Sequence, residues 1–276
     1  MDEGVPVAGD ARKPEIVSSD EQEVVAYLRE HYYDEANKAS CRLDIKDGIY
    51  RRYVKRVVDI LVSLVVLIVT LPFNLVFALI TFVDVGRPVI FKQERTGRGG
   101  KSFTMIKLRN MKELRDESGE LLPASQRVTR FGHFMRKYSL DELLNFWSVL
   151  KGDMSIIGPR PYPTFFTERM TDRHKLRHEL RPGIECPKMI TLSNESERLY
   201  NVKLENDLWY VENCSFRTDL RMVGRLVGMV LNFKVRNKHA GSLSYFVGYD
   251  DQGYALGMRE AVEFLEGSTE HGVKSS

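Results

Sequence analysis

The sequence contains few cysteines, little net charge and no internal repeat. Its three cysteines, Cys41, Cys186 and Cys214, are far apart in a chain of 276 residues. An odd, scattered set provides neither a disulfide framework nor a zinc site, and it is typical of a reducing compartment. The net charge of +3 does not indicate a nucleic-acid partner, because no recognisable binding motif accompanies it. These absences leave a folded, water-facing protein of one or two domains.

Charge is also absent from one long apolar run, residues 60–83, which reads ILVSLVVLIVTLPFNLVFALITFV. Such a run is longer than an ordinary soluble core helix, and a straight helix would span about 36 Å, enough to cross a bilayer. Pro72 lies in its middle and is expected to break or kink the helix. The nearby polar residues Ser63, Thr70 and Asn74 are expected to satisfy the backbone groups that the break frees.

Both flanks of this run are basic. Lys and Arg are enriched on the cytoplasmic side of membrane segments, so two basic flanks predict that both ends stay on that face. A re-entrant hairpin of two half-helices satisfies this pattern, and a bent helix that spans the bilayer is the alternative. Asp59, at the start of the run, is expected to pair with Arg56 or Lys55. The flanking cations are Arg51, Arg52, Lys55 and Arg56 before the run, and Arg87, Lys92, Arg95, Arg98 and Lys101 after it.

The remaining patterns predict a helix-rich α/β fold with a short β-hairpin. Residues 20–39 have a helical pattern, and residues 89–91 and 103–108 are β-prone around a glycine-rich turn that lacks the residues of a phosphate loop. The segment SLDELLNFWSVLKG predicts a helix that ends at Gly152. Its expected apolar face consists of Leu140, Leu143, Leu144, Trp147 and Leu150.

A later segment, residues 217–238, predicts a basic amphipathic helix. Leu220, Val223 and Val227 fall on one side of it, and arginines are available for the other faces. A basic amphipathic helix beside a membrane segment is typical of a helix on the bilayer surface. Packing of the same apolar side on the domain core is an equally good interpretation, so both stay open.

Asp141 and Glu142 are adjacent carboxylates near the start of the predicted helix. Ser139 and Glu142 match a capping box, which is a purely structural role. Arg136 and Lys137 lie just upstream, and cations there favour the ionised form of both acids. Successive helical residues diverge by about 100°, so one carboxylate can attack a phosphorus atom while the other helps to hold a divalent cation.

Three arginines could recognise phosphate. Arg160 lies between prolines in GPRPYP, and Arg181 begins a second stiff turn, RPG. With Arg136 they would form an anion-binding cluster if the fold brings them together, because a rigidly presented guanidinium suits phosphate. His174 and His178 are four residues apart, but no third ligand accompanies them, so we expect a solvated helix face rather than a metal site.

Taken together, these stretches resemble the bacterial sugar transferase family, the monotopic polyprenyl-phosphate phosphoglycosyl transferases. The likeness covers about residues 51–235. One departure follows RPG, where the family usually has a Thr-Gly-Trp-like stretch and this sequence reads IECPKMITLS. The stretches that resemble the family are KRVVDILVS, the proline in the apolar run, PVIFKQERTGRGGKSFTMIKLRNM, SLDELLNFWSVLKGDMSIIGPRP, KLRHELRPG and, more weakly, DLWYVENCSFRTDLRMV.

The resemblance implies transfer of a phosphosugar from a UDP-sugar to a polyprenyl phosphate, with Mg²⁺ as cofactor. It implies that Asp141 is the nucleophile, which forms a covalent phosphosugar intermediate and releases UMP. It assigns Glu142 to metal or proton handling, so that both acids meet the metal. The implied phosphate and nucleotide residues are Arg136, Arg160, Arg181, Lys107 and Arg109. The implied membrane anchor consists of Lys55, Arg56, Asp59 and Pro72.

The expected organisation is a polar extension with one helix (1–50), a re-entrant membrane segment (51–86), a catalytic domain (87–236) and a C-terminal extension (237–276). The resemblance implies an enzyme on the cytoplasmic face of the inner membrane that starts the assembly of an exopolysaccharide, capsule, O-antigen or glycoprotein glycan. A homo-oligomer stays open. The alternative function is a membrane-tethered scaffold or regulatory partner that kept the fold without turnover.

Overall fold

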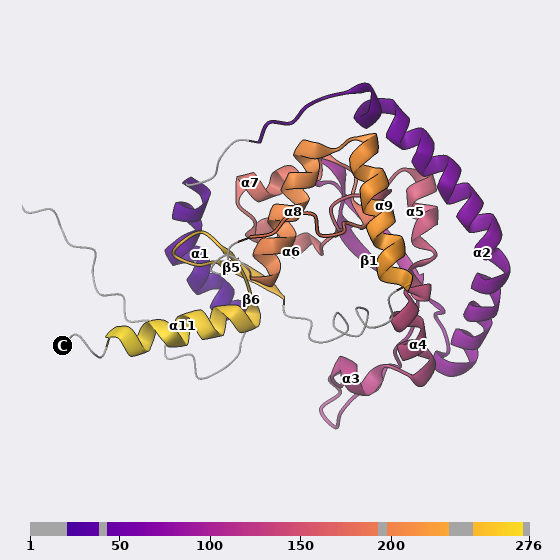
Figure 1. Cartoon of the computed structure of the whole chain (residues 1–276). Helices are drawn as coiled ribbons and strands as arrows, with labels where there is room; N and C mark the ends of the chain where they lie inside the picture. Colours follow the sequence, from indigo (N-terminus) through magenta and orange to yellow (C-terminus); the bar gives the residue numbers. More distant parts are fainter. Residues whose placement is uncertain (1–20, 39–42, 193–197, 232–244, 273–276) are drawn as a thin grey trace, which may run out of the picture.

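Residues 21–38, 43–192, 198–231 and 245–272 are described by a computed structural model. As predicted, the fold is helix-rich α/β, with one long apolar helix and two-stranded sheets (Figure 1). The first 20 residues of the polar extension lie outside this description.

The apolar run forms one continuous helix, α2 (Lys55–Val85), which follows a π-helical turn, η1 (Tyr50–Val54). Figure 1 shows α2 bowed around the outside of the domain, and Pro72 lies within it. Asn74 Nδ2 donates to Thr70 Oγ1 at 3.2 Å, so these two polar side chains are linked across the proline. Because a proline removes only one backbone donor, the predicted break takes the form of a bend, and the helix continues through it.

The side of α2 that faces the domain is polar, and its outer side is apolar. Leu75 and Leu79, for example, are each 64% exposed. Within the described ranges α2, with the turn before it, is the one helix long and apolar enough to cross a membrane. This inverted polarity suggests association with a lipid bilayer. The buried residues of α2 are Lys55, Asp59, Ser63, Asn74 and Thr81.

The predicted hairpin after the membrane segment is confirmed. Strand β1 (Ile90–Thr96) pairs antiparallel with β2 (Ser102–Leu108), and Ile90 lies opposite Leu108. The glycine-rich connection forms a short 3-10 turn, η2 (Arg98–Gly100), in which Gly99 has a φ of 65°.

Short helices follow the hairpin. Thr129 Oγ1 accepts a hydrogen bond from Gly132 N at 2.8 Å and so caps the second of them. Gly132 is required there, because a Cβ at this position would lie 2.2 Å from the carbonyl oxygen of Asn110. These elements are α3 (Ala124–Arg127), α4 (Arg130–Tyr138), η3 (Leu140–Glu142) and α5 (Asn145–Lys151).

Gly152 ends α5 with a φ of 105°, as predicted, but the predicted apolar face of this segment is not the buried one. Trp147 is 53% exposed, whereas Asn145 and Ser148 are buried. The reason is that α5 packs against the polar inner side of α2. Arg56 of α2 donates to the backbone carbonyl of Val149 at 2.5 Å and so joins α2 to α5.

The domain also contains a two-stranded parallel sheet made of very short strands. Strand β3 (Ser155–Ile157) pairs in parallel with β4 (Gly183–Glu185). Gly183 allows this close approach, because a Cβ there would lie 2.1 Å from the backbone nitrogen of Gly158. Helical elements lie between and after these strands: α6 (Thr164–Arg169), α7 (Asp172–Lys175), η4 (Leu176–Glu179), α8 (Leu199–Asn213) and α9 (Phe216–Leu231).

Helix α9 is amphipathic, as predicted, and its apolar side is exposed. Leu220 is 60% and Val227 is 52% exposed, whereas Thr218 and Asp219 face the domain. The apolar side therefore does not pack on the core. This excludes one of the two interpretations of the helix.

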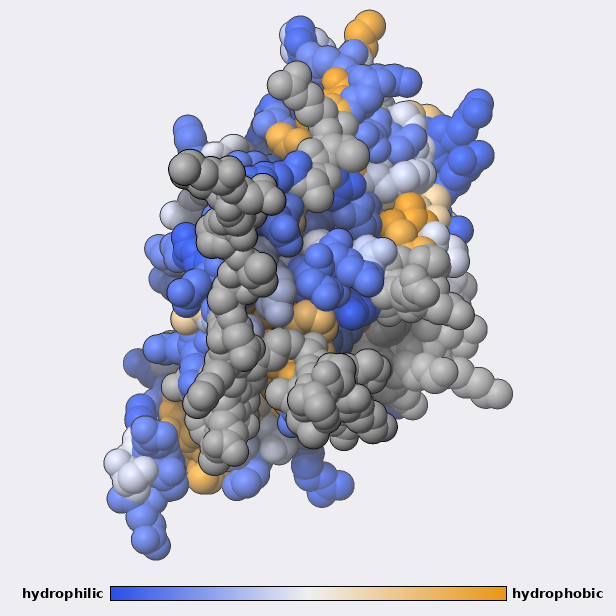
Figure 2. Space-filling model, turned by 90° about the vertical axis from the view of Figure 1, so that its left-hand side faces the viewer, coloured by the Kyte–Doolittle hydropathy of each residue, from blue (hydrophilic) through white to orange (hydrophobic). Residues whose placement is uncertain are grey.

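The first described helix and the last described elements of the chain pack together. The predicted N-terminal helix is α1 (Glu21–Lys38), in which Val24 and Leu28 are each 1% exposed. It packs against β5 (Phe246–Tyr249), β6 (Ala255–Gly257) and α11 (Met258–Gly272). We call α1, β5, β6 and α11 the terminal layer. It lies away from α2 in Figure 1, and Figure 2 shows that most of the described surface on this side is hydrophilic.

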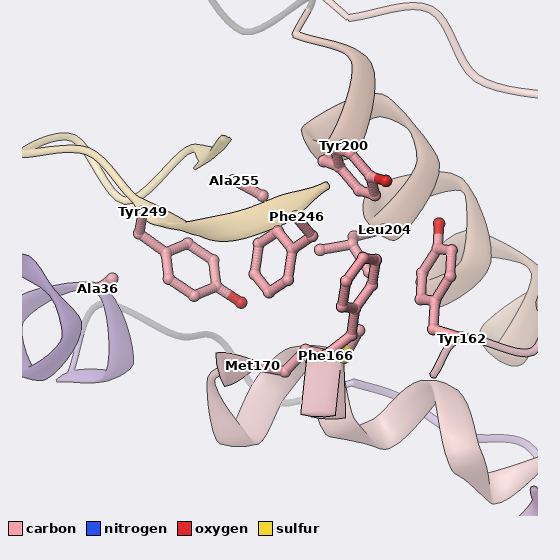
Figure 3. Packing of buried hydrophobic residues seen from close by; sticks show 9 residues of the cluster. All are labelled: Ala36, Tyr162, Phe166, Met170, Tyr200, Leu204, Phe246, Tyr249 and Ala255. Atoms are coloured by element: carbon pink, nitrogen blue, oxygen red, sulfur yellow. The ribbon is translucent and has the colours of Figure 1, made fainter. Parts of the chain in front are cut away.

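An aromatic-rich core joins the terminal layer to the centre of the domain. Phe246 of β5 packs on Phe166 and Tyr200, which belong to α6 and α8 (Figure 3). Tyr162 extends this cluster, with its ring centroid 5.6 Å from that of Phe166. Because Tyr162 follows Arg160 by two residues, the core anchors the proline-rich loop that carries this arginine.

Candidate active site

Asp141 lies in a sharp turn between α4 and α5. Ser139 ends α4 in the left-handed conformation, with φ of 54° and ψ of 30°, and Asp141 follows in η3. The Asp141 side chain is directed inward, and the residue is only 5% exposed. Asn110 Nδ2 donates to Asp141 Oδ2 at 2.8 Å. Arg136 donates from Nε and Nη2 to Asn110 Oδ1, at 3.1 and 2.9 Å, and so fixes the orientation of the amide.

The pKa of Asp141 is raised from its ordinary value. Burial is the main cause, and the charge of Glu142 adds to it, whereas Lys107 and Arg136 act in the opposite direction. The sequence predicted that upstream cations would favour the ionised form, which corresponds to a lower pKa. Burial outweighs this effect. Lys107 has a pKa lowered by burial and is itself stabilised as a cation by Asp141 and Glu142. A buried carboxylate whose pKa is shifted by burial and by neighbouring charges is an arrangement common in functional sites.

The capping box predicted for Ser139 and Glu142 is wrong. The left-handed serine turns the chain, and its side chain makes no capping hydrogen bond. Glu142 Oε1 instead accepts from Arg160 Nη2 at 3.1 Å, and Arg160 Nη1 donates to Glu185 Oε2, also at 3.1 Å. Arg160 therefore bridges two carboxylates, and its side chain is 46% exposed. Glu185 lies in the stretch after RPG, which thus places an acid beside Arg160.

A buried arginine holds the Arg160 loop in place. Arg177 is 1% exposed, and its Nη2 donates to the carbonyl oxygen of Arg160 at 2.6 Å. The same guanidinium binds Asp207 Oδ2 from Nε at 3.0 Å and lies 4.3 Å from the centroid of the Tyr162 ring. Neither Asn110 nor Arg177 was predicted as a site residue from the sequence. Their only signal was a place within stretches that resemble the family, because neither lies at a regular spacing from Asp141.

The three predicted phosphate-binding arginines are only partly brought together. Arg136 binds Asn110, which in turn binds Asp141, and Arg160 binds Glu142 directly. The Nε of Arg181 donates instead to the Gly152 carbonyl at 2.9 Å.

Arg181 lies near the start of α2. Burial lowers its pKa, and the nearby cations Arg56 and Arg98 lower it further. Arg109 is also engaged elsewhere, since its Nη1 donates to the carbonyl oxygen of Arg87 at 3.0 Å at the base of the hairpin.

The predicted anchor residues fasten the start of α2 to the domain. Lys55 Nζ binds Asp219 Oδ2 of α9 at 2.6 Å, and Tyr210 donates to the other oxygen of this acid, also at 2.6 Å. Asp59 Oδ1 accepts from the Ile156 backbone nitrogen at 3.1 Å. The predicted pairing of Asp59 with Arg56 or Lys55 is therefore wrong, because Lys55 meets an acid of α9 and Asp59 meets a strand.

The predicted solvated face for the two histidines is also wrong. His174 and His178 are 4% and 7% exposed. The Nδ1 of His174 lies 2.8 Å from the Tyr249 hydroxyl, and its Nε2 lies 3.0 Å from Glu205 Oε1. His174 of α7 contacts Tyr249 of the terminal layer, and His178 lies in η4, which packs against α8; neither contact was visible in the local sequence. In the described part of the chain, no group of three or more His, Cys, Asp or Glu side chains is arranged to hold a metal ion.

The Asp141–Glu142 pair fits a magnesium ion that arrives with a substrate phosphate. Mg²⁺ is usually held by one or two carboxylates, with waters and phosphate oxygens completing its octahedron, so it does not need a cage of protein ligands. Two adjacent carboxylates among cations match this chemistry better than that of a structural metal site.

Comparison with known proteins gives a consistent result. A profile of the bacterial sugar transferase family matches residues 50–233, which include α2, the dyad and α9 but not the terminal layer. The chain is 39% identical over 177 residues to an uncharacterized sugar transferase of Bacillus subtilis (strain 168), EpsL. This alignment covers 64% of the chain and 87% of EpsL.

Two further relatives have names that state a reaction. The UDP-N-acetylgalactosamine-undecaprenyl-phosphate N-acetylgalactosaminephosphotransferase of Aeromonas hydrophila is 33% identical over 186 residues, or 65% of this chain and 44% of that protein. The UDP-glucose:undecaprenyl-phosphate glucose-1-phosphate transferase of Klebsiella pneumoniae is 35% identical over 178 residues, or 61% and 38%. The chain thus spans less than half of these two relatives. With the family profile matching more than half of its residues, the chain belongs to the bacterial sugar transferase family.

Proposed function

We propose that this protein transfers a sugar 1-phosphate from a UDP-sugar to undecaprenyl phosphate or a similar polyprenyl phosphate, and so starts the assembly of a polysaccharide. The named relatives act on UDP-sugars and undecaprenyl phosphate. The observation that carries the proposal is the Asp141 carboxylate, buried and oriented by Asn110, with Glu142 and Arg160 beside it. This arrangement favours an enzyme over a scaffold that has lost turnover.

The proposed reaction has two displacements at one carboxylate. Asp141 attacks the phosphorus that carries the sugar, a bond between carboxylate oxygen and phosphorus forms, and the bond to UMP breaks. The lipid phosphate then attacks the same phosphorus, which frees Asp141 and yields a polyprenyl diphosphate sugar. Arg160 and Lys107 are close enough to Glu142 and Asp141 to stabilise the negative charge on the transferred group.

Magnesium fits the same two carboxylates. Asp141 and Glu142 would hold it, and when bound it neutralises phosphate charge. Arg160 already divides its hydrogen bonds between Glu142 and Glu185, so it keeps a carboxylate partner if Glu142 turns to a metal.

We also propose that α2 enters the cytoplasmic leaflet and returns. The parts of α2 before and after Pro72 contact the same domain: Arg56 binds carbonyls of α5, and Phe77 packs on Phe131 of α4 with ring centroids 6.2 Å apart. The exposed apolar side of α9 would rest on the bilayer surface. Cysteines introduced at Arg52 and Lys101 should react with a membrane-impermeant reagent from the same side of sealed vesicles. Reaction from opposite sides would establish a spanning helix.

The reaction is tested with the purified full chain in detergent, Mg²⁺, a set of UDP-sugars and a polyprenyl phosphate, with UMP as the readout. Asp141→Asn should abolish UMP release, because an amide is a poor nucleophile. Asp251→Asn, at an exposed residue in the turn between β5 and β6, is the matched control and should keep the activity. Mass spectrometry should find a sugar phosphate on Asp141 when the lipid is omitted. UMP release that survives Asp141→Asn would remove Asp141 as nucleophile.

A further inference from the structure

Four aromatic rings form a row that leads from α2 to the catalytic turn. Phe77 of α2 lies 6.2 Å from Phe131, Phe131 lies 6.2 Å from Phe134, and Phe134 lies 5.0 Å from Tyr138, measured between ring centroids. Figure 1 shows α4, which carries the last three rings, beside the C-terminal end of α2. We call these four residues the aromatic row.

The row is on the outer side of α4. Phe134 is 46% exposed, and the other three rings are only partly buried. The opposite side of α4, with Gly132 and Met135, packs into the domain. The rings are therefore not needed to fill the core, since α4 is already fixed by its buried side.

Polarity changes along the row in one direction. It begins at Phe77, among the exposed apolar residues of α2, and it ends next to Ser139, two residues before Asp141. Cations gather at this end, where Lys137 Nζ lies 5.7 Å from the Tyr138 ring centroid and Arg136 binds Asn110. An amphiphile with a long apolar tail and an anionic head matches this order of surfaces.

We propose that the aromatic row is the binding track for the isoprenoid tail of the lipid acceptor and guides its phosphate from the bilayer to Asp141. This inference rests on the proposed function, which identifies the lipid acceptor as a polyprenyl phosphate. Nothing else in the reaction needs such a track: the nucleotide sugar has no long apolar part, whereas the tail of the lipid must stay out of water while its phosphate reaches a buried carboxylate.

Binding is tested separately from turnover. The full chain in lipid nanodiscs is incubated with a 55-carbon polyprenyl phosphate that carries a photoreactive diazirine in its tail, irradiated and digested. Labelling should concentrate on the peptide that contains residues 130–138 and should fall in Phe134→Ala. The matched control is Phe165→Ala, because Phe165 of α6 is 40% exposed but lies outside the row. Labelling that falls elsewhere, or that is equal in both variants, would overturn the proposal.

Kinetics provide the second arm. Phe134→Ala should raise the KM for the 55-carbon lipid about tenfold, the effect expected from losing one aromatic contact with the tail. The KM for the UDP-sugar, and the first release of UMP without lipid, should stay at the wild-type values. A 10-carbon acceptor, too short to follow the row, should show no change. An equal loss with both acceptors would refute the track, whereas an inactive wild type with labelled α4 would refute only the proposed function.

Discussion

Helix α2 and the terminal layer have opposite polarity. In α2 the residues that face the domain include Lys55, Asp59 and Ser63, while most of its leucines and valines are exposed. In the terminal layer Val24 and Leu28 are buried against β5 and α11, and most of the described surface on this side is hydrophilic (Figure 2). The difference indicates two surroundings, since an apolar exterior is stable only against lipid or another apolar partner.

The two regions also differ in their relation to the family. The family profile includes α2 and ends at residue 233, before β5. The terminal layer is thus added to the family domain, on the side away from α2 in Figure 1. It joins that domain through Phe246 and Phe166, in the core that also holds Tyr162 of the Arg160 loop. A loosened terminal layer would therefore affect the site through this core and would not affect the membrane contact.

The largest expected effect is on the free energy of unfolding, when a leucine is replaced by alanine either in the terminal layer or in α2. Leu28→Ala should lower the free energy of unfolding by about 2–5 kcal/mol, because it leaves a cavity in a buried cluster. Leu75→Ala in α2, at a residue 64% exposed, should change it by less than about 0.5 kcal/mol in detergent. Thermal unfolding of the full chain in detergent measures both. An equal loss would mean that α2 packs against protein on its outer side as well.

Local sequence patterns predicted those elements that local forces decide. The hairpin, the N-terminal helix and the end of α5 at Gly152 follow from alternation, helical periodicity and a left-handed cap. The long apolar run predicted a helix, but it did not show that polar residues four apart, such as Asp59 and Ser63, would turn inward. That orientation depends on which side of the helix faces the domain. The apolar run alone does not indicate this side.

The site was predictable only where its residues are neighbours in sequence. Asp141 and Glu142 are adjacent, and Arg160 stands in a stiff loop, so their residue types alone suggested phosphate chemistry. Asn110 precedes Asp141 by 31 residues and meets it only because α4 packs closely over Gly132. The displacement of Arg181 toward the end of α5 likewise depends on tertiary packing.

The smallest expected effect is a pH dependence at the junction of the terminal layer with α7 and α8. Burial lowers the pKa of His174 below its ordinary value near 6.5, although a hydrogen bond with Glu205 acts against this. The folded chain thus favours the neutral ring. The stability that depends on it is present above the ordinary pKa and is lost as the pH falls below it, by at most about 1.4 kcal/mol per pH unit.

Hydrogen exchange in β5 and α11, compared at pH 7 and pH 5, measures this loss. Because intrinsic amide exchange slows as the pH falls, the rates are compared as protection factors. These factors should fall from pH 7 to pH 5 more in the wild type than in His174→Gln, which has no titrating ring. The matched control is His133→Gln, at an exposed histidine of α4, which should keep the wild-type pH response. Because Tyr249 of β5 contacts the His174 ring, the added exchange should appear in the terminal layer before it appears in α2. Equal pH responses of the wild type and His174→Gln would show that protonation of His174 does not control this junction.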